Sequence, residues 1–257
     1  YRGRGKETMN TPNQNSALKL RPRRGLHLTA KKGALVDLAF WEDLDCVYRT
    51  LVATLFNFVP TSGHPGGSIS SGRIVEALVF DAMDYDYSDP AGPANDLLCY
   101  AAGHKAMGLY SLWGLRNECV RIGKPGLLPD LARQIRFEDL LGFRRNPTQP
   151  TSLFKQFKSK ALDGHPTPAT PFIPIATGAS GVGVPAAMGV AMGCLDVYGA
   201  KAPRVHAIEG EGGMTPGRLH EALASAATMG ISNFTLHVDW NQSSIDSDRV
   251  CAEGDKT

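Results

Sequence analysis

Two polar residues of this sequence stand in closely similar settings. Glu211 comes directly after the apolar run "VHAIEG", and Asn241 follows the run "NFTLHVDW" thirty positions later. A carboxylate and an amide oxygen are ligands that Mg²⁺ accepts, usually together with phosphate oxygens. If the two runs are neighbouring strands of a parallel sheet, they end about 5 Å apart, and both oxygens can reach one cation.

Glycines surround the acid in the segment "EGEGGMTPG". Gly212 and Gly213 allow the backbone to approach a phosphate closely, and we expect them to open a helix whose N-terminal amides favour an anion. Glycines at a strand-to-helix turn more often serve packing than binding. The acid, the spacing and the second strand end favour a metal-bridged diphosphate site here.

Three histidines lie beside glycine in expected loops or helix starts. They are His64 in "TSGHPGG", His104 in "AAGHKAMG" and His165 in "DGHPTP". An imidazole near neutral pH can bind hydroxyl groups and transfer protons, but a lone histidine is more often a satisfied structural residue. We interpret His27, His206, His220 and His237 as structural, and Asp239 as a possible support for Asn241.

The apolar periodicity indicates the elements that hold these residues in place. Helices are expected over 34–59, 71–83, 107–121, 182–198 and 218–229, and strands over 96–102, 204–210 and 233–239. Loops are expected over 61–68 and 165–174, a glycine-rich turn begins at 177, and 123–160 is expected to be irregular with some helix near 131–141. The final strand, helix and strand form a βαβ unit, which predicts an α/β fold with a mostly parallel central sheet and helices on both faces. Ligands of such sheets bind outside the carboxyl ends of the strands.

The composition fits one α/β domain preceded by a tail. The chain has 257 residues, 42% hydrophobic and 20% charged, with a net charge of +2. Residues 1–33 are basic and turn-rich, and we expect a partly ordered arm, with the domain over 34–257. Nucleic-acid binding is not favoured, because Tyr1 is the only aromatic residue within the arm.

The cysteines and the apolar segments bear on the compartment. Five widely spaced cysteines without a CxxC pair argue against a disulfide framework or a zinc site and favour a reducing, cytoplasmic compartment. Residues 177–195 carry no charge but are rich in Gly, Ala and Ser, so we expect a buried helix rather than a membrane span. The first residue is not Met, and we expect the chain to begin within a longer protein.

These segments, taken in order, resemble the transketolase family. "GEGGMTPGRLHEA" and "NFTLHVDWNQSSID" are similar to its thiamine-diphosphate motif, and "TSGHPGG", "AAGHKAMGLYSLWGL", "DGHPTP" and "TGASGVGVPAAMGVAM" are similar to its three histidine loops and its glycine-rich turn. The resemblance runs from about residue 38 to residue 248. It implies the pyrophosphate-binding domain of a thiamine-diphosphate-binding fold, as the N-terminal part or subunit of a transketolase.

The resemblance implies roles for individual residues. Metal ligands are Glu211, Asn241 and the Ser243 carbonyl, for Mg²⁺ or for Ca²⁺ or Mn²⁺; cofactor contacts are His104, Gly178, Ser180, Gly210, Gly212 and Gly213; and His64 and His165 face the substrate. The expected reaction is the transfer of a two-carbon ketol unit between sugar phosphates, as in the pentose phosphate pathway, by a dimer or other oligomer. Carbanion chemistry in this reaction belongs to the cofactor.

The sequence departs from the family pattern in three places. Glu211 replaces an aspartate and carries one more methylene, about 1.5 Å of extra reach. Ala179 and Ser180 replace Pro-Leu beneath the cofactor. Sixteen residues follow Asn241, and the pyrimidine-binding domain with its glutamate is not among them. We therefore expect an incomplete C-terminal part, a site completed by a partner subunit or by the remainder of the chain, and no turnover by this chain alone.

Two alternatives stay open from the sequence. One is the first component of a 2-oxo acid dehydrogenase, although three histidines suit hydroxyl-rich sugars better than a small oxo acid. A sugar-phosphate enzyme also needs cations that bind phosphate at the mouth of the site, and the candidates are Arg144, Arg145 and Lys155. The other alternative is a non-catalytic structural or regulatory relative, suggested by Glu211 and by the missing regions.

Overall fold

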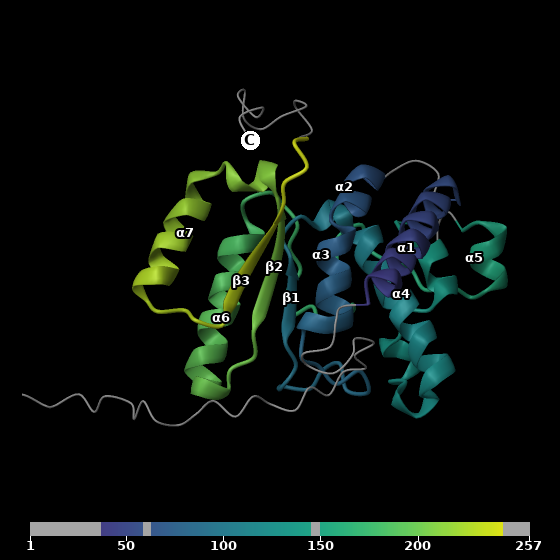
Figure 1. Ribbon diagram of the computed structural model, residues 1–257, viewed down its shortest axis with the longest axis horizontal. Helices are drawn as coiled ribbons and strands as arrows, with labels where there is room; N and C mark the ends of the chain where they lie inside the picture. Colours follow the sequence, from purple (N-terminus) through teal and green to yellow (C-terminus); the bar gives the residue numbers. More distant parts are fainter. Residues whose placement is uncertain (1–36, 59–62, 145–149, 244–257) are drawn as a thin grey trace, which may run out of the picture.

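The computed structural model describes residues 37–58, 63–144 and 150–243. The predicted basic arm lies outside these residues, as do Arg145 and Cys251. Within the described part, three parallel strands form one sheet in the order β1-β2-β3: β1 is Leu97–Tyr100, β2 is Val205–Gly210 and β3 is Phe234–Asp239. The predicted α/β class with a parallel sheet is confirmed, because helices lie on both sides of these strands (Figure 1).

The register aligns the carboxyl ends of β2 and β3. Gly210 lies opposite Asp239, and β1 pairs with the other side of β2. Between β2 and β3 the chain forms helix α7, Gly217–Thr228, which completes the predicted βαβ unit. Five of the six residues of β2 are buried, as expected of a central parallel strand covered on both faces.

One face of the sheet packs against α6, Gly183–Tyr198, and α7 packs beside α6. Alternate residues of β2, Val205 and Ala207, meet Ala187 and Ala191 of α6 in a small apolar cluster. The expectation of a buried helix holds for one face of α6 only, because Val197 is 72% exposed. The stretch Gly183–Lys201 is long and apolar enough to cross a membrane by length and composition, yet here its inner face covers the sheet.

The opposite face carries the larger core. Leu98, Tyr100 and Ile208 of the sheet pack against the helices of the N-terminal half. These are α1, Leu38–Phe58; α2, Pro65–Ser70; α3, Gly72–Ala77, continued by a π-helical turn, Leu78–Ala82; and α4, Ala106–Gly123. Trp113 of α4 is fully buried at the centre of this core.

The helix α2 departs from the sequence expectation. We predicted a loop over residues 61–68 because of its glycines and proline, but helix begins at Pro65, inside that segment. A proline in the first helical turn loses no hydrogen bond, since the N–H it lacks would have had no intrahelical partner. The early start brings Ser70 onto a helix beside the strand ends.

The segment between α4 and α6 is irregular, as predicted. It contains 3₁₀ turns over Pro125–Leu127, Leu131–Arg133 and Phe137–Gly142, and the short helix α5, Ser152–Gln156. Three further 3₁₀ turns are Gly103–Lys105 before α4, Gly199–Lys201 after α6 and Glu211–Met214 before α7. The helix α5 lies at the end of the molecule away from β3 (Figure 1).

Candidate functional site

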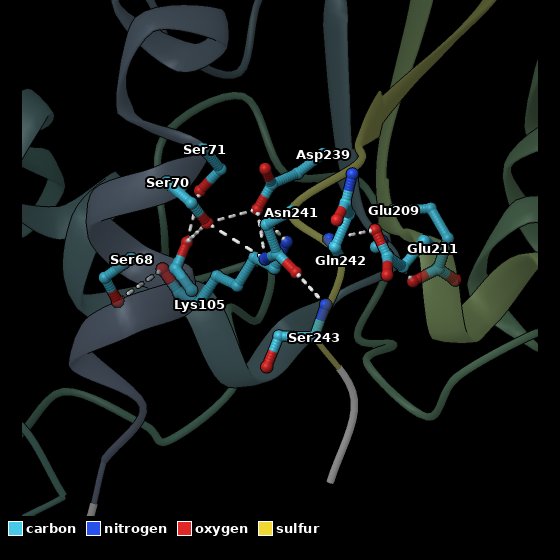
Figure 2. Close-up of polar contacts among 12 residues, drawn as sticks. Ser68, Ser70, Ser71, Lys105, Glu209, Glu211, Asp239, Asn241, Gln242 and Ser243 are labelled. Carbon is cyan, nitrogen blue, oxygen red and sulfur yellow. Dashed lines mark hydrogen bonds and ion pairs between the residues drawn. The ribbon is translucent and has the colours of Figure 1, made fainter. Parts of the chain in front are cut away.

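Glu211 and Asn241 lie at the same edge of the sheet. Each follows the end of its strand, and the paired ends Gly210 and Asp239 hold the two segments side by side. Glu211 is 2% exposed, and its Oε2 accepts a hydrogen bond from the Gln242 backbone N–H at 2.6 Å. The carboxylate of Glu211 thus reaches the turn that follows Asn241 (Figure 2).

The Asn241 amide is held at both ends. Its Nδ2 donates to Ser70 Oγ and to Asp239 Oδ2, both at 3.1 Å, while its Oδ1 accepts from the Ser243 backbone N–H at 3.0 Å. Gln242 has a φ of 56°, an uncommon value for a residue other than glycine, and it turns the backbone sharply at this point. Glu211, Asn241 and Ser243, the three predicted metal ligands, therefore meet at one turn.

The donor set of this turn fits a hard cation. Glu211 is a buried carboxylate, and no ion pair reaches it among the residues that the structure describes. A buried charge without a partner is costly, so an arriving cation would compensate it. The described residues contain no cluster of three or more His, Cys, Asp and Glu side chains suited to a metal. A metal at this edge must therefore draw on amide and main-chain oxygens, which Mg²⁺ accepts.

A buried ion pair lies directly beneath Asn241. Lys105 is 1% exposed and its ammonium contacts Asp239, whose Oδ2 also accepts from Ser70 Oγ at 2.5 Å (Figure 2). Asp239 was expected to support Asn241, and the hydrogen bond between them is present. Sequence reasoning missed Lys105 and Ser70, because nothing in "GHKAMG" or "GGSIS" marks either residue as buried.

The three predicted histidines come close to one another. The rings of His64 and His104 contact edge to face with centroids 5.0 Å apart. Burial, followed by the charge interactions with Lys105, His64, His165 and Arg144, lowers the pKa of His104 to about 4. Burial also lowers the pKa of His165, with Arg144 and His64 contributing. A neutral His104 can donate from one ring nitrogen and accept at the other.

Gly178 is confined against His165. Its φ is +143°, and a Cβ at this position would lie 2.4 Å from the His165 Nδ1 and 3.0 Å from the Gly103 Cα. Only glycine fits there without a shift of the imidazole or of the backbone. Ser180, two residues later, is exposed, so the glycine-rich turn joins the histidine group at one end and faces outward at the other.

The glycines around Glu211 differ from the sequence expectation. Gly212 and Gly213 lie in a 3₁₀ turn, Glu211–Met214, and not in the α-helix, which begins only at Gly217. A Cβ on Gly213 would collide with the carboxylate of Glu209, at 2.1 Å from its Cδ. Packing against Glu209 is therefore enough to explain a glycine at position 213, without any contact to a phosphate.

Glu209 is a buried acid that the sequence did not single out. Its carboxylate accepts from the backbone N–H groups of Gly210 at 2.8 Å and Gly181 at 3.4 Å. Burial raises the pKa of this carboxyl group. Glu209 ties the turn after β2 to the glycine-rich turn before α6, so both turns depend on one side chain.

Other predicted groups lie outside this edge or at its margin. His206 and His237 form a hydrogen-bonded pair, with Nδ1 and Nε2 3.1 Å apart, on neighbouring strands, in keeping with a structural role. Arg144 lies against Gly164 and contributes to the lowered pKa of His165, which brings one candidate phosphate-binding cation to the histidines. Lys155 is exposed on α5.

Comparison with known proteins places this arrangement in context. No family model matches the chain. It is 34% identical over 182 residues to transketolase-like protein 2 of Bos taurus and 32% identical over 182 residues to human transketolase, covering 70% of this chain and 24% of each relative. It is 28% identical over 184 residues to one subunit of the apulose-4-phosphate transketolase of Actinobacillus succinogenes, and it covers 56% of that subunit.

Solved structures agree on the fold. Transketolase from Leishmania mexicana superposes with a TM-score of 0.62 at 24% identity, and a Pichia stipitis transketolase complex with sedoheptulose-7-phosphate gives 0.58 at 22%. Each covers 80% of this chain, and this chain covers 28% of each. The chain thus spans about a quarter of the length of the first curated relatives it matches.

Proposed function

Because this chain is a homologue of transketolases over about 70% of its length, we propose that it supplies the diphosphate- and metal-binding part of a transketolase-like enzyme. The observation that carries the proposal is the pair Glu211 and Asn241 at the ends of neighbouring parallel strands, where the buried carboxylate has no cation beside it among the described residues. The first-component dehydrogenase alternative is not favoured by these relatives.

In this proposal Glu211, Asn241 and the Ser243 carbonyl hold a divalent cation, Mg²⁺ or, given the longer acid, Mn²⁺ or Ca²⁺. When bound, thiamine diphosphate supplies the carbanion chemistry that moves a two-carbon ketol unit between sugar phosphates. Gly210 and the Gly212 N–H line the diphosphate, and Gly178 and Ser180 flank the thiamine rings.

The three histidines have separate roles in this proposal. His104, whose pKa of about 4 keeps it neutral at pH 7, donates an N–H to a diphosphate oxygen. His64 and His165 would bind substrate hydroxyls and accept or return the protons of those hydroxyls during bond cleavage and formation. Arg144, beside His165, binds the substrate phosphate.

We also propose that a second polypeptide, or another part of a longer protein, completes the site, and that the protein works in the cytoplasm. The relative from Actinobacillus succinogenes is itself named as one subunit of a transketolase, which supports a two-component enzyme. The four described cysteines are free, which agrees with a reducing compartment. This chain alone is then expected to bind its cofactor without turning over a ketose phosphate.

Calorimetric titration of the chain with thiamine diphosphate at millimolar Mg²⁺ tests the proposal. We expect metal-dependent binding that weakens at least about tenfold in Glu211→Ala and in Asn241→Ala, since even residues that only support ligands affect metal affinity this much. Glu42→Ala and Asn57→Ala, exposed positions of α1, serve as matched controls and should bind like wild type. The absence of heat with the wild-type chain at any Mg²⁺, Mn²⁺ or Ca²⁺ concentration would refute the proposal.

A further inference from the structure

Resting on the function proposed above, we propose that Lys105 is a positioning residue of the metal site. By holding Asp239 it fixes the Asn241 amide so that the oxygen, and not the nitrogen, is presented at the turn where Glu211 binds. The proposal concerns the orientation of a ligand; Lys105 itself need not touch metal or cofactor.

Lys105 reaches Asp239 along a path that two glycines leave open. A Cβ on Gly67 would lie 3.1 Å from the Lys105 Cγ, and a Cβ on Gly210 would lie 3.3 Å from the Lys105 Nζ. The side chain is thus enclosed between α2 and the end of β2, and only 2% of it is exposed. Lysine is rarely buried unless it is paired, so its contact with Asp239 holds the ammonium in one place.

Asp239 in turn decides which end of the amide faces it. Its Oδ2 receives the Lys105 ammonium, the Ser70 hydroxyl and the Asn241 Nδ2. An ionised carboxylate only accepts hydrogen bonds, so the amide must turn its NH₂ end toward it. The Ser70 hydroxyl gives its proton to Asp239 and accepts from the same NH₂ group. Both partners therefore direct Oδ1 toward the Ser243 N–H, in the same turn whose Gln242 N–H binds Glu211.

Without Lys105, the Asp239 carboxylate loses its only cationic partner among the described residues. The carboxylate then rotates toward water, and the two ends of the amide, which are nearly equal in size, become interchangeable. An amide nitrogen has no lone pair to offer a metal, so each reversal removes one ligand. Cation affinity falls as a result.

The sign of the effect separates positioning from simple electrostatics. Removing a positive charge near a cation site should strengthen cation binding if Lys105 acts only through space. Loss of ligand orientation should weaken binding about 10–100-fold, the range seen when groups that orient metal ligands are removed. The two explanations therefore predict opposite changes for the same substitution.

A first experiment needs no cofactor. In ¹H–¹⁵N spectra of the full chain, the side-chain NH₂ signals of Asn241 are identified by their loss in Asn241→Asp. Lys105→Met should shift these signals and speed their exchange with water. Arg204→Met is the matched control: it removes the cation paired with the buried Asp96 at the opposite ends of the strands, and it should leave the Asn241 signals in place. Unchanged signals in Lys105→Met would overturn the inference.

A second experiment measures Mn²⁺ binding by electron paramagnetic resonance at saturating thiamine diphosphate. We expect Lys105→Met to bind about 10–100-fold more weakly than wild type and Arg204→Met to bind equally well. In an Asn241→Ala background the Lys105→Met change should add nothing, because the residue it positions is gone. Equal or tighter binding by Lys105→Met, or an undiminished effect in the Asn241→Ala background, contradicts positioning.

One further variant keeps the test decisive if Lys105→Met does not fold. Lys105→Met combined with Asp239→Asn removes both charges of this ion pair, so neither is left buried without its partner, yet the new amide can present either end to Asn241. The Asn241 NH₂ signals should again shift and exchange faster with water, and Mn²⁺ should again bind more weakly. If wild type binds no Mn²⁺ at all, the proposed function fails, and the Asn241 signals still decide whether Lys105 orients that side chain.

Discussion

Substituting Gly178 by alanine tests the packing of the glycine-rich turn against the histidines. The new methyl group would lie 2.4 Å from the His165 Nδ1 and 3.0 Å from the Gly103 Cα, at a φ of +143°. The backbone strain costs about 1–3 kcal/mol. Overpacking costs about 1–3 kcal/mol more. We expect Gly178→Ala to lose about 2–6 kcal/mol of unfolding free energy, measured by urea denaturation.

Gly189→Ala is the matched control. Gly189 is an exposed residue of α6, and a Cβ there would meet nothing within 4 Å. In a helix interior alanine is more favourable than glycine by about 0.5–1 kcal/mol, so this variant should be slightly more stable than wild type. The same Gly→Ala substitution is thus expected to lower the unfolding free energy at position 178 and to raise it at position 189.

The double variant Gly178→Ala with His165→Ala separates the two costs. Removing the imidazole relieves its contact with the new methyl group but leaves the strained φ. In the His165→Ala background, Gly178→Ala should therefore cost about half as much unfolding free energy as it costs in the wild-type protein. If Gly178→Ala is as stable as wild type, or if removal of His165 restores nothing, the close approach of this turn to His165 is wrong.

Three further changes test other parts of the fold. Burial lowers the pKa of His206 to about 4 in the folded state, so the unfolded chain takes up a proton first as the pH falls below about 6.5. The unfolding free energy should therefore be at its full value above about pH 6.5 and fall by up to about 3 kcal/mol toward pH 4, as measured by denaturant titration at each pH. The same fall in a His206→Phe variant would contradict this. Trp113→Ala should lose about 3–5 kcal/mol in denaturant titrations, because a fully buried indole leaves a large cavity, and a loss below about 1 kcal/mol, the level of a surface change, would argue against a core position. Asn233→Ala should lose about 1–3 kcal/mol, since its Nδ2 serves the carbonyls of Ala191 and Pro203, whereas Asn57→Ala on the surface should cost little.

The strands and the rim residues were predictable from the sequence because their signals are local. The runs ending at Gly210 and Asp239 are apolar, short and separated by one helix, which is enough to place Glu211 and Asn241 on one edge. Helix periodicity likewise located α4 and α6. The start of α2 at Pro65 was missed because glycine and proline signal a loop and a helix start in the same way.

The supporting residues of the site could not be read from the sequence. Lys105 and Glu209 are charged, and charged side chains are expected at the surface until a partner from a distant segment is known. Their partners, Asp239 for Lys105 and the Gly181 N–H for Glu209, lie 134 and 28 positions away. Burial of such groups is decided by tertiary contacts, which no local pattern records.

The three tryptophans of this chain sit at very different depths. Trp113 is enclosed, Trp41 packs partly against the core, and Trp240 stands 58% exposed immediately before Asn241. The fluorescence emission of Trp240 should therefore lie at longer wavelength than that of Trp113. It should also change more than that of Trp113 when a ligand binds at the strand ends. With Trp41 replaced by phenylalanine, the molecule carries its own optical reporter of site occupancy, with the interior indole as an internal reference.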